Sequence, residues 1–159
     1  MRIGFGSDIH KLEKGVPLII GGVDIDSDLG SVGHSDGDAL LHAVTDSVLG
    51  ALALGDIGTH FPPSDDAWKD ADSSVFLSTA VDKMRENGYE VANLDAIVNL
   101  ERPRLRPFIE KIRENLAGLL QTEGGNVSLK AKTGDGLDAV GECRAIKAEA
   151  CILLKKASS

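Results

Sequence analysis

Histidines and aspartates recur in the first 46 residues at spacings that suit a metal site. His42 has Asp38 four residues before it and Asp46 four residues after it, so in a helix all three lie along one face. Asp8 and His10 are two residues apart, which places them on one face of a strand. Neutral imidazole is the commonest metal ligand. Asp8, His10 and His42 together give three protein ligands, the number that a catalytic zinc site uses while a fourth position stays open.

The same residues also have a simpler interpretation. Two aspartates at helical spacing are typical of a solvated helix face. An Asp-x-His pair such as Asp8-Ile9-His10 also arises by chance in surface turns. Spacing alone therefore leaves metal binding and a solvated surface open.

A second group of chemically capable residues follows the predicted strand at 126–132. Lys132 and Thr133 can contact phosphate oxygens, and Asp135 suits magnesium, with glycines between and beside them. Three arginines lie between residues 102 and 106, just before a predicted helix. Cations at a helix N-terminus interact unfavourably with the helix dipole. These arginines therefore either point to solvent or bind an anion.

Periodicity and turn residues predict the elements that position these groups. Ser35 with Asp38 forms a capping box in acidic form, so a helix is expected from about Asp36 through Leu52, with Gly55 after it. A purely architectural helix is expected from residue 72 or 73 to Gly88, and a third helix from Pro107 to about residue 123. Strands are expected at 1–10, at 16–21 paired with 23–25, and at 89–100, 126–132 and 144–155, with loops at 26–33 and 55–65.

This order of elements fits an α+β fold, a two-layer sandwich of a mixed β-sheet with helices on one face. The 159 residues are about one domain's length, so a single domain over 1–159 is expected. Aromatic residues make up only 4% of the chain. The core is therefore aliphatic, and the aromatic platform of single-stranded nucleic-acid binders is missing.

The charge pattern also narrows the function. The net charge of −8 argues against nucleic acid and anionic membranes as partners, and a phosphate ligand would need cations. Cys143 and Cys151 fall in one predicted strand, about 26 Å apart at ~3.3 Å per residue, too far for a disulfide. Neither an apolar leader after Met1 nor a run of eighteen apolar residues occurs, so a cytoplasmic protein with reduced thiols is expected.

Several short motifs along nearly the whole chain are more specific in combination than any one of them is alone. They are Asp8-Ile9-His10, His34-Ser35-Asp36-Gly37-Asp38, His42, Asp46, Gly55-Asp56-Ile57-Gly58, Phe61-Pro62 and Lys130-Ala131-Lys132-Thr133. In this order and spacing they resemble the family of 2-C-methyl-D-erythritol 2,4-cyclodiphosphate synthases, phosphorus-oxygen lyases of the non-mevalonate isoprenoid pathway. The histidine four residues after Ser-Asp-Gly-Asp, followed by Gly-Asp-Ile-Gly, is highly specific.

The resemblance implies a homotrimer with three active sites between neighbouring subunits, each holding zinc on Asp8, His10 and His42. It implies the substrate 4-diphosphocytidyl-2-C-methyl-D-erythritol 2-phosphate, a cytidine nucleotide. The 2-phosphate attacks the β-phosphorus, CMP leaves, and an eight-membered cyclic diphosphate forms without a protein nucleophile. Mg²⁺ or Mn²⁺ bridging the substrate phosphates near Asp135 would stabilise the leaving group.

The resemblance also implies roles for single residues. Those with a catalytic role are Asp46, which supports the zinc site, and Lys132, Thr133 and Asp135. Substrate contacts are implied for His34 and Ser35 at the methylerythritol phosphate, for Asp56, Ile57 and Gly58 near the ribose and erythritol, for Asp65, for Thr133 at a phosphate, and for Leu100, Pro103, Arg104, Leu105, Arg106 and Ala131 around cytosine.

Some positions depart from the common family pattern. Asp135 stands where glutamate is usual, one methylene shorter, and Lys132 replaces a frequent threonine. Glu142 and Arg144 exchange the usual arginine and glutamate, so no isoprenoid diphosphate is expected in a cavity on the trimer axis. Two alternatives stay open: a metal-dependent phosphohydrolase with the same ligands, and a non-catalytic trimeric module that binds a small ligand.

Overall fold

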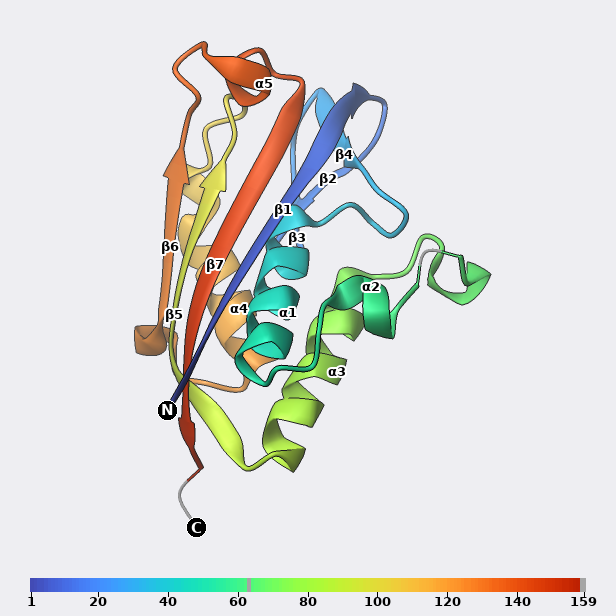
Figure 1. The fold of residues 1–159 in the computed structure, drawn as a ribbon. Helices are drawn as coiled ribbons and strands as arrows, with labels where there is room; N and C mark the ends of the chain where they lie inside the picture. Colours follow the sequence, from blue (N-terminus) through green and yellow to red (C-terminus); the bar gives the residue numbers. More distant parts are fainter. Residues whose placement is uncertain (63, 158–159) are drawn as a thin grey trace.

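A five-stranded mixed sheet forms the centre of the computed structural model, which describes residues 1–62 and 64–157 (Figure 1). The strand order is β4-β1-β7-β5-β6, with β6 parallel to β5 and the other neighbours antiparallel. Strands β2 and β3 form a separate hairpin. The strands are β1 (Arg2–Lys14), β2 (Leu18–Ile20), β3 (Val23–Ile25), β4 (Leu29–Val32), β5 (Tyr89–Asn99), β6 (Val127–Lys132) and β7 (Ala145–Lys156). The helices are α1 (Ala39–Ala51), α2 (Ile57–His60), α3 (Ser73–Glu86), α4 (Ile109–Leu120) and α5 (Asp138–Gly141).

Helices α1, α3 and α4 cover one face of the sheet, as Figure 1 shows. Helix α1 packs directly on β1 because two positions of that strand are glycines. A Cβ atom on Gly4 would collide with the carbonyl oxygen of Ser47, and one on Gly6 with that of Ala43. The strand therefore admits the helix backbone at a distance that a side chain would forbid.

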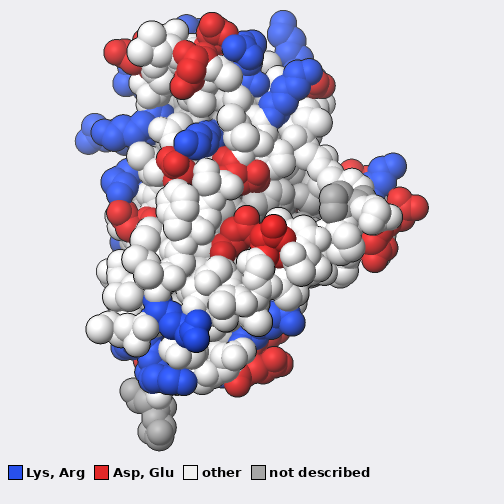
Figure 2. All heavy atoms as spheres, viewed as in Figure 1, with Lys and Arg blue, Asp and Glu red and all other residues white. Residues whose placement is uncertain are grey.

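None of the described elements covers the other face of the sheet. Ile3, Phe5 and Ile9 of β1 point to this face and are 70%, 64% and 57% exposed. Figure 2 shows mostly uncharged side chains over the middle of the sheet. Single exposed apolar residues are normal, but a contiguous group on a sheet marks an interaction surface.

The α+β class, the mixed sheet and the helices on one face are confirmed, and so is the aliphatic core. The predicted β2–β3 hairpin forms, and α3 begins after its cap Asp72. The predicted closing strand forms as β7, and its buried face consists of Ile146, Ala148, Ala150, Ile152 and Leu154.

Three expected elements need correction. Helix α1 begins at Ala39 rather than near Asp36, because Asp38 and not Ser35 is the N-cap and accepts a hydrogen bond from the Leu41 amide. The segment 26–33 is not all loop, since β4 pairs with β1, and β1 continues past residue 10 to make that pairing. The segment 55–65 contains the short helix α2, while Pro63 lies outside the described residues.

Smaller differences concern the C-terminal half. Helix α4 begins at Ile109, after a 3₁₀ turn at Arg106–Phe108. Ala131 of β6 is exposed, whereas Val127 and Leu129 of the same strand are buried. Cys143 precedes β7 rather than lying in it, and both cysteines are free, as predicted.

Among the described residues, no helix has the length and apolar character needed to cross a membrane.

Candidate active site

Asp8, His10 and His42 converge on one point between β1 and α1. The Asp8 Oδ2 atom lies 2.8 Å from His42 Nδ1 and 2.8 Å from His10 Nε2. The two ring nitrogens are 3.1 Å apart. One oxygen and two nitrogens therefore face one another at the edge of the helix-covered face of the sheet, where the sequence predicted a metal site.

The remaining ring nitrogen of each histidine has its own partner. His10 Nδ1 is 2.9 Å from the Val32 carbonyl oxygen of β4, which can only accept, so Nδ1 carries a proton. His42 Nε2 is 2.9 Å from Ser73 Oγ and 3.0 Å from Ser35 Oγ. Metal-binding histidines commonly have such a partner on the nitrogen that does not bind the metal.

These three residues fit a divalent metal ion. In a tetrahedral zinc site with bonds of about 2.0–2.1 Å, ligand atoms lie roughly 3.3 Å apart. The two nitrogens are close to that spacing at 3.1 Å, and the two contacts of Asp8 are shorter at 2.8 Å. Burial acts to raise the pKa of Asp8, but hydrogen bonds from His10 and His42 and their charges hold it well below its usual value. Burial acts to lower the pKa of His10, and the neighbouring Asp8 carboxylate outweighs this and raises it. The carboxylate is thus kept ionised and ready to bind a cation.

Asp38, the first residue of the predicted row, is structural. It is fully buried, and its Oδ1 accepts hydrogen bonds from the Gly21 and Leu41 amides at 3.0 and 2.9 Å. Its Oδ2 accepts from the Gly22 amide at 2.6 Å. Burial raises the pKa of Asp38 to about 6. The residue joins the β2–β3 turn to the start of the helix that carries His42.

Asp46, further along α1, contacts α2 rather than the three-residue cluster. Its Oδ1 accepts a hydrogen bond from the Ile57 amide at 2.7 Å, and burial raises its pKa. Asp56 caps the same short helix through Thr59. Asp46 therefore holds the segment 56–58 beside the cluster, and its predicted support of a metal ligand stays a prediction.

A pocket of about 160 Å³ opens next to the three-residue cluster. Its lining combines two of the cluster's histidines, four predicted substrate contacts and three aromatic rings: His10, His42, His34, Ser35, Ile57, Gly58, Phe61, Trp68 and Phe76. The Phe61 ring centroid is 4.6 Å from that of Phe76 and 5.1 Å from that of Trp68. The pocket thus combines polar side chains with a cluster of aromatic rings.

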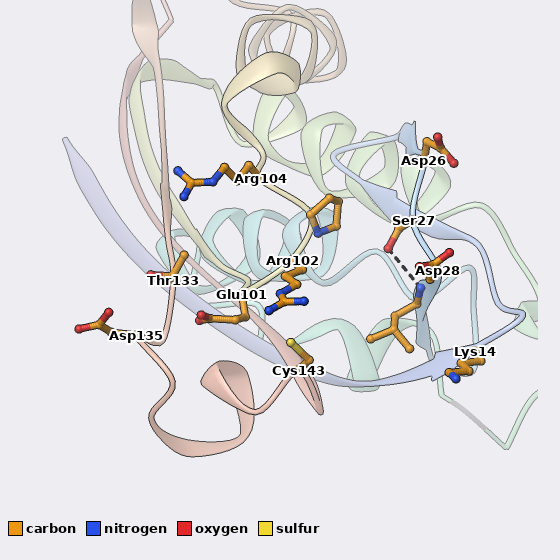
Figure 3. Close-up of a pocket in the computed structure, with 12 residues that line it drawn as sticks. Lys14, Asp26, Ser27, Asp28, Glu101, Arg102, Arg104, Thr133, Asp135 and Cys143 are labelled. Carbon is orange, nitrogen blue, oxygen red and sulfur yellow. Dashed lines mark hydrogen bonds between the residues drawn. The ribbon is translucent and has the colours of Figure 1, made fainter.

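A larger cavity of about 1080 Å³ is lined by other predicted site residues, among them Thr133 and Asp135 (Figure 3). Figure 3 shows residues of 101–104 and 133–143 facing the segment 26–28 across it. Its lining consists of Lys14, Asp26, Ser27, Asp28, Leu29, Glu101, Arg102, Pro103, Arg104, Thr133, Asp135 and Cys143. Glu101 Oε2 accepts a hydrogen bond from the Gly134 amide at 2.9 Å, which fixes the loop between Thr133 and Asp135.

Other predicted contacts lie outside both linings. Leu100 and Leu105 are buried in the core at 3% and 4% exposure. Arg106, Ala131 and Lys132 are exposed beside the larger cavity's loops. Asp65 is exposed and caps the turn at Asp66–Trp68 through the Ala67 amide.

The predicted site residues that line a cavity therefore fall into two groups, in different cavities of one chain. Sequence reasoning missed the contribution of α3, which was expected to be architectural only, since Ser73 contacts His42 and Phe76 lines its pocket. The only signal available was that Ser73 and Phe76 are three residues apart, and so share a helix face.

Comparisons with known proteins agree over nearly the whole chain. The model of the YgbB family matches residues 1–155. The chloroplastic 2-C-methyl-D-erythritol 2,4-cyclodiphosphate synthase of rice is 54% identical over 155 residues, which cover 98% of this chain and 70% of the relative. The enzyme of that name from Salinibacter ruber is 49% identical over 157 residues, covering 99% and 100%.

Solved structures give the same picture. A 2C-methyl-D-erythritol-2,4-cyclodiphosphate synthase in a CDP-bound form has a TM-score of 0.90 at 38% identity, covering 97% of this chain and 100% of that one. A CDP complex of IspF from Plasmodium falciparum has a TM-score of 0.87 at 35% identity, covering 99% and 97%.

Proposed function

The chain belongs to the YgbB family of 2-C-methyl-D-erythritol 2,4-cyclodiphosphate synthases, and we propose that its Asp8–His10–His42 cluster is the centre of the ring-closing reaction. The substrate is 4-diphosphocytidyl-2-C-methyl-D-erythritol 2-phosphate. An oxygen of its 2-phosphate bonds to the β-phosphorus, and the bond from that phosphorus to the bridging oxygen of CMP breaks. CMP leaves with the electron pair, and the remaining two phosphates close the ring.

The observation that carries this proposal is the convergence of Asp8 Oδ2, His10 Nε2 and His42 Nδ1 within 3.1 Å of one another. The three side chains would hold zinc. A zinc ion bound there supplies positive charge to the β-phosphate, where the attack brings two anions together. The protein needs such a charge because its own net charge is −8.

Neighbouring groups of the chain bind the erythritol end. Ser35 and His34 border the pocket beside the cluster, where a hydroxyl and an imidazole can donate to a phosphate. The rings of Phe61, Trp68 and Phe76 form the opposite wall and suit the methyl-bearing carbon skeleton. Ile57 and Gly58, held in place by Asp46, bring backbone groups to the same pocket.

The second cavity would take the cytidine end. Thr133 would contact a phosphate, and Asp135 would hold Mg²⁺ or Mn²⁺, whose positive charge would favour the departure of CMP. Pro103 and Arg104 lie beside cytosine, with the buried Leu100 and Leu105 supporting the loop. The CDP in the names of two related structures supports a cytidine nucleotide as ligand.

The two cavities are joined when chains assemble, and we infer a homotrimer in which each active site lies between neighbouring subunits. Support comes from the uncovered sheet face, where Ile3, Phe5 and Ile9 would be buried by other copies. Analytical ultracentrifugation tests this, and a monomeric enzyme with full activity would contradict it. The cytoplasmic location and the single domain over 1–159 stay predictions.

The decisive experiment is conversion of the diphosphocytidyl substrate by purified protein with zinc and magnesium, with both products identified by ³¹P NMR. We expect the cyclic diphosphate and CMP. An open-chain bisphosphate with CMP would instead indicate the phosphohydrolase. Native protein that holds no zinc and releases no CMP would favour the non-catalytic binding module.

A further inference from the structure

We propose that Ser73, held by Asp36, is a positioning residue that holds Nε2 of His42, and so presents Nδ1 of the same ring to the metal. The inference rests on the metal-binding role proposed for His42. Ser73 is the first residue of α3, so the inference gives this helix a part in the site.

The direction of the hydrogen bonds follows from the chemistry of the three groups. An ionised carboxylate only accepts, so the short contact between Ser73 Oγ and Asp36 Oδ1 uses the serine proton. Ser73 Oγ is then left with lone pairs, and it lies 2.9 Å from His42 Nε2. The proton of that hydrogen bond must therefore be on Nε2. The opposite nitrogen of the ring, Nδ1, faces Asp8 Oδ2 at 2.8 Å, and a metal ion between these two atoms would take the place of a proton on Nδ1 while Nε2 keeps its own.

The arrangement is built into the fold rather than left to surface side chains. Ser73 is fully buried. Its amide donates to Asp36 Oδ2 at 3.0 Å, so Asp36 holds both polar groups of the serine. The backbone ties the same two segments together, from the Asp36 amide to the Ala71 carbonyl at 3.1 Å and from the Asp70 amide to the His34 carbonyl at 2.9 Å.

Ser35 is the second hydroxyl near His42 Nε2, at 3.0 Å, and it lies 3.2 Å from Ser73 Oγ. No carboxylate accepts its proton among the described contacts, so this hydroxyl can accept or donate and does not determine the state of the ring. Because Ser73 already holds His42 Nε2, Ser35 is free to turn toward a substrate phosphate. Ser73 thus positions the metal ligand, and Ser35 contacts the substrate.

The test compares Ser73→Ala with Ser47→Ala. Ser47 is an equally buried serine of α1 whose hydroxyl donates to the Val44 carbonyl, away from the cluster. Zinc affinity is measured by competition with a chromophoric chelator. We expect Ser73→Ala to bind zinc roughly 10–100-fold more weakly, the usual effect of losing a group that orients a ligand, and Ser47→Ala to bind as the wild type does. Equal affinity in Ser73→Ala and wild type would overturn the proposal.

A second measurement reads the ring directly. Long-range ¹H–¹⁵N NMR of the zinc-loaded wild type should show the metal on Nδ1 of His42 and the proton on Nε2. Ser73→Ala should show a mixture of rings that bind zinc through Nδ1 and through Nε2. Zinc on Nε2 in the wild type would refute the inference even if the variant does not fold. Failure of the proposed function looks different, because wild-type protein would then bind no zinc at all.

Discussion

The approach of α1 to β1 should set the geometry of the metal site, and Gly6→Ala tests this. A Cβ atom on Gly6 would lie 2.8 Å from the Ser47 amide nitrogen and closer still to the Ala43 carbonyl oxygen. Ala43 is the neighbour of His42 in the sequence. The helix must therefore move away from the strand at the very turn that carries a metal ligand, while Asp8 and His10 stay on the strand.

The size of the effect follows from these contacts. Relieving them moves α1 by on the order of 1 Å, because packed interiors have no free space to absorb a methyl group. Metal–ligand distances tolerate only about 0.2 Å. Zinc affinity should fall by at least the roughly 10–100-fold seen when a ligand is misoriented. Overpacking should also lower the free energy of unfolding by about 1–3 kcal/mol.

Gly50→Ala is the matched control, because Gly50 lies on the same helix and its added Cβ would meet only the Phe5 carbonyl oxygen, at 3.9 Å. It should raise stability by about 0.4–1 kcal/mol and leave zinc affinity unchanged. Stability is measured by urea unfolding and affinity by chelator competition. If folded Gly6→Ala binds zinc as tightly as the wild type, the spacing of α1 and β1 does not set the site. Equal losses of zinc affinity in Gly6→Ala and Gly50→Ala would also refute the role of this spacing.

Three further predictions concern single side chains. His42→Ala should lose zinc while keeping the far-ultraviolet circular dichroism of the wild type, and zinc at wild-type stoichiometry by metal analysis would contradict the ligand role. Asp135→Asn should raise the magnesium concentration needed for half-maximal rate, and an unchanged magnesium dependence would count against a second metal there. Burial raises the pKa of Asp38 to about 6 from 3.8, so its proton-linked stability is complete below the lower value and is lost as pH rises through the higher one. Urea unfolding measures the free energy of unfolding of the wild type and of Asp38→Asn. The difference, wild type minus variant, should therefore fall between pH 4 and 7. A rise in this difference would show that the fold lowers the pKa of Asp38 instead.

The sequence predicts the metal cluster well because its residues lie in regular elements. A strand places Asp8 and His10 on one face, and this holds in the structure. Helical spacing correctly puts His42 on α1, but it also puts Asp38 in the same row. Asp38 instead caps the helix and is fully buried, because a residue at the first turn can bond to amides rather than follow the helix face.

What the sequence does not reveal depends on contacts between distant segments. Strand β4 escapes prediction because its short Leu-Gly-Ser-Val stretch has no apolar alternation, and it forms by pairing with β1. The role of Ser73 is equally hidden, since its partner Asp36 lies in another loop. In the sequence, a serine at the start of a helix indicates only ordinary helix capping. Its role becomes visible when the fold places the Asp36 carboxylate beside it.

The two faces of β1 explain why the site and the uncovered surface occur together. Gly4, Gly6, Asp8 and His10 alternate with Ile3, Phe5, Ser7 and Ile9 along the strand. The glycines lie on the same face as Asp8 and His10, so the face that admits α1 also carries the proposed metal ligands. Pairing with β7 places Gly6 opposite Ala150 and Asp8 opposite Ala148, which keeps small side chains beside the cluster. A register slip of one residue would exchange the two faces, burying phenylalanine and isoleucine under α1 and turning both ligands away from His42. Metal binding and the proposed subunit contact are therefore fixed by a single strand register.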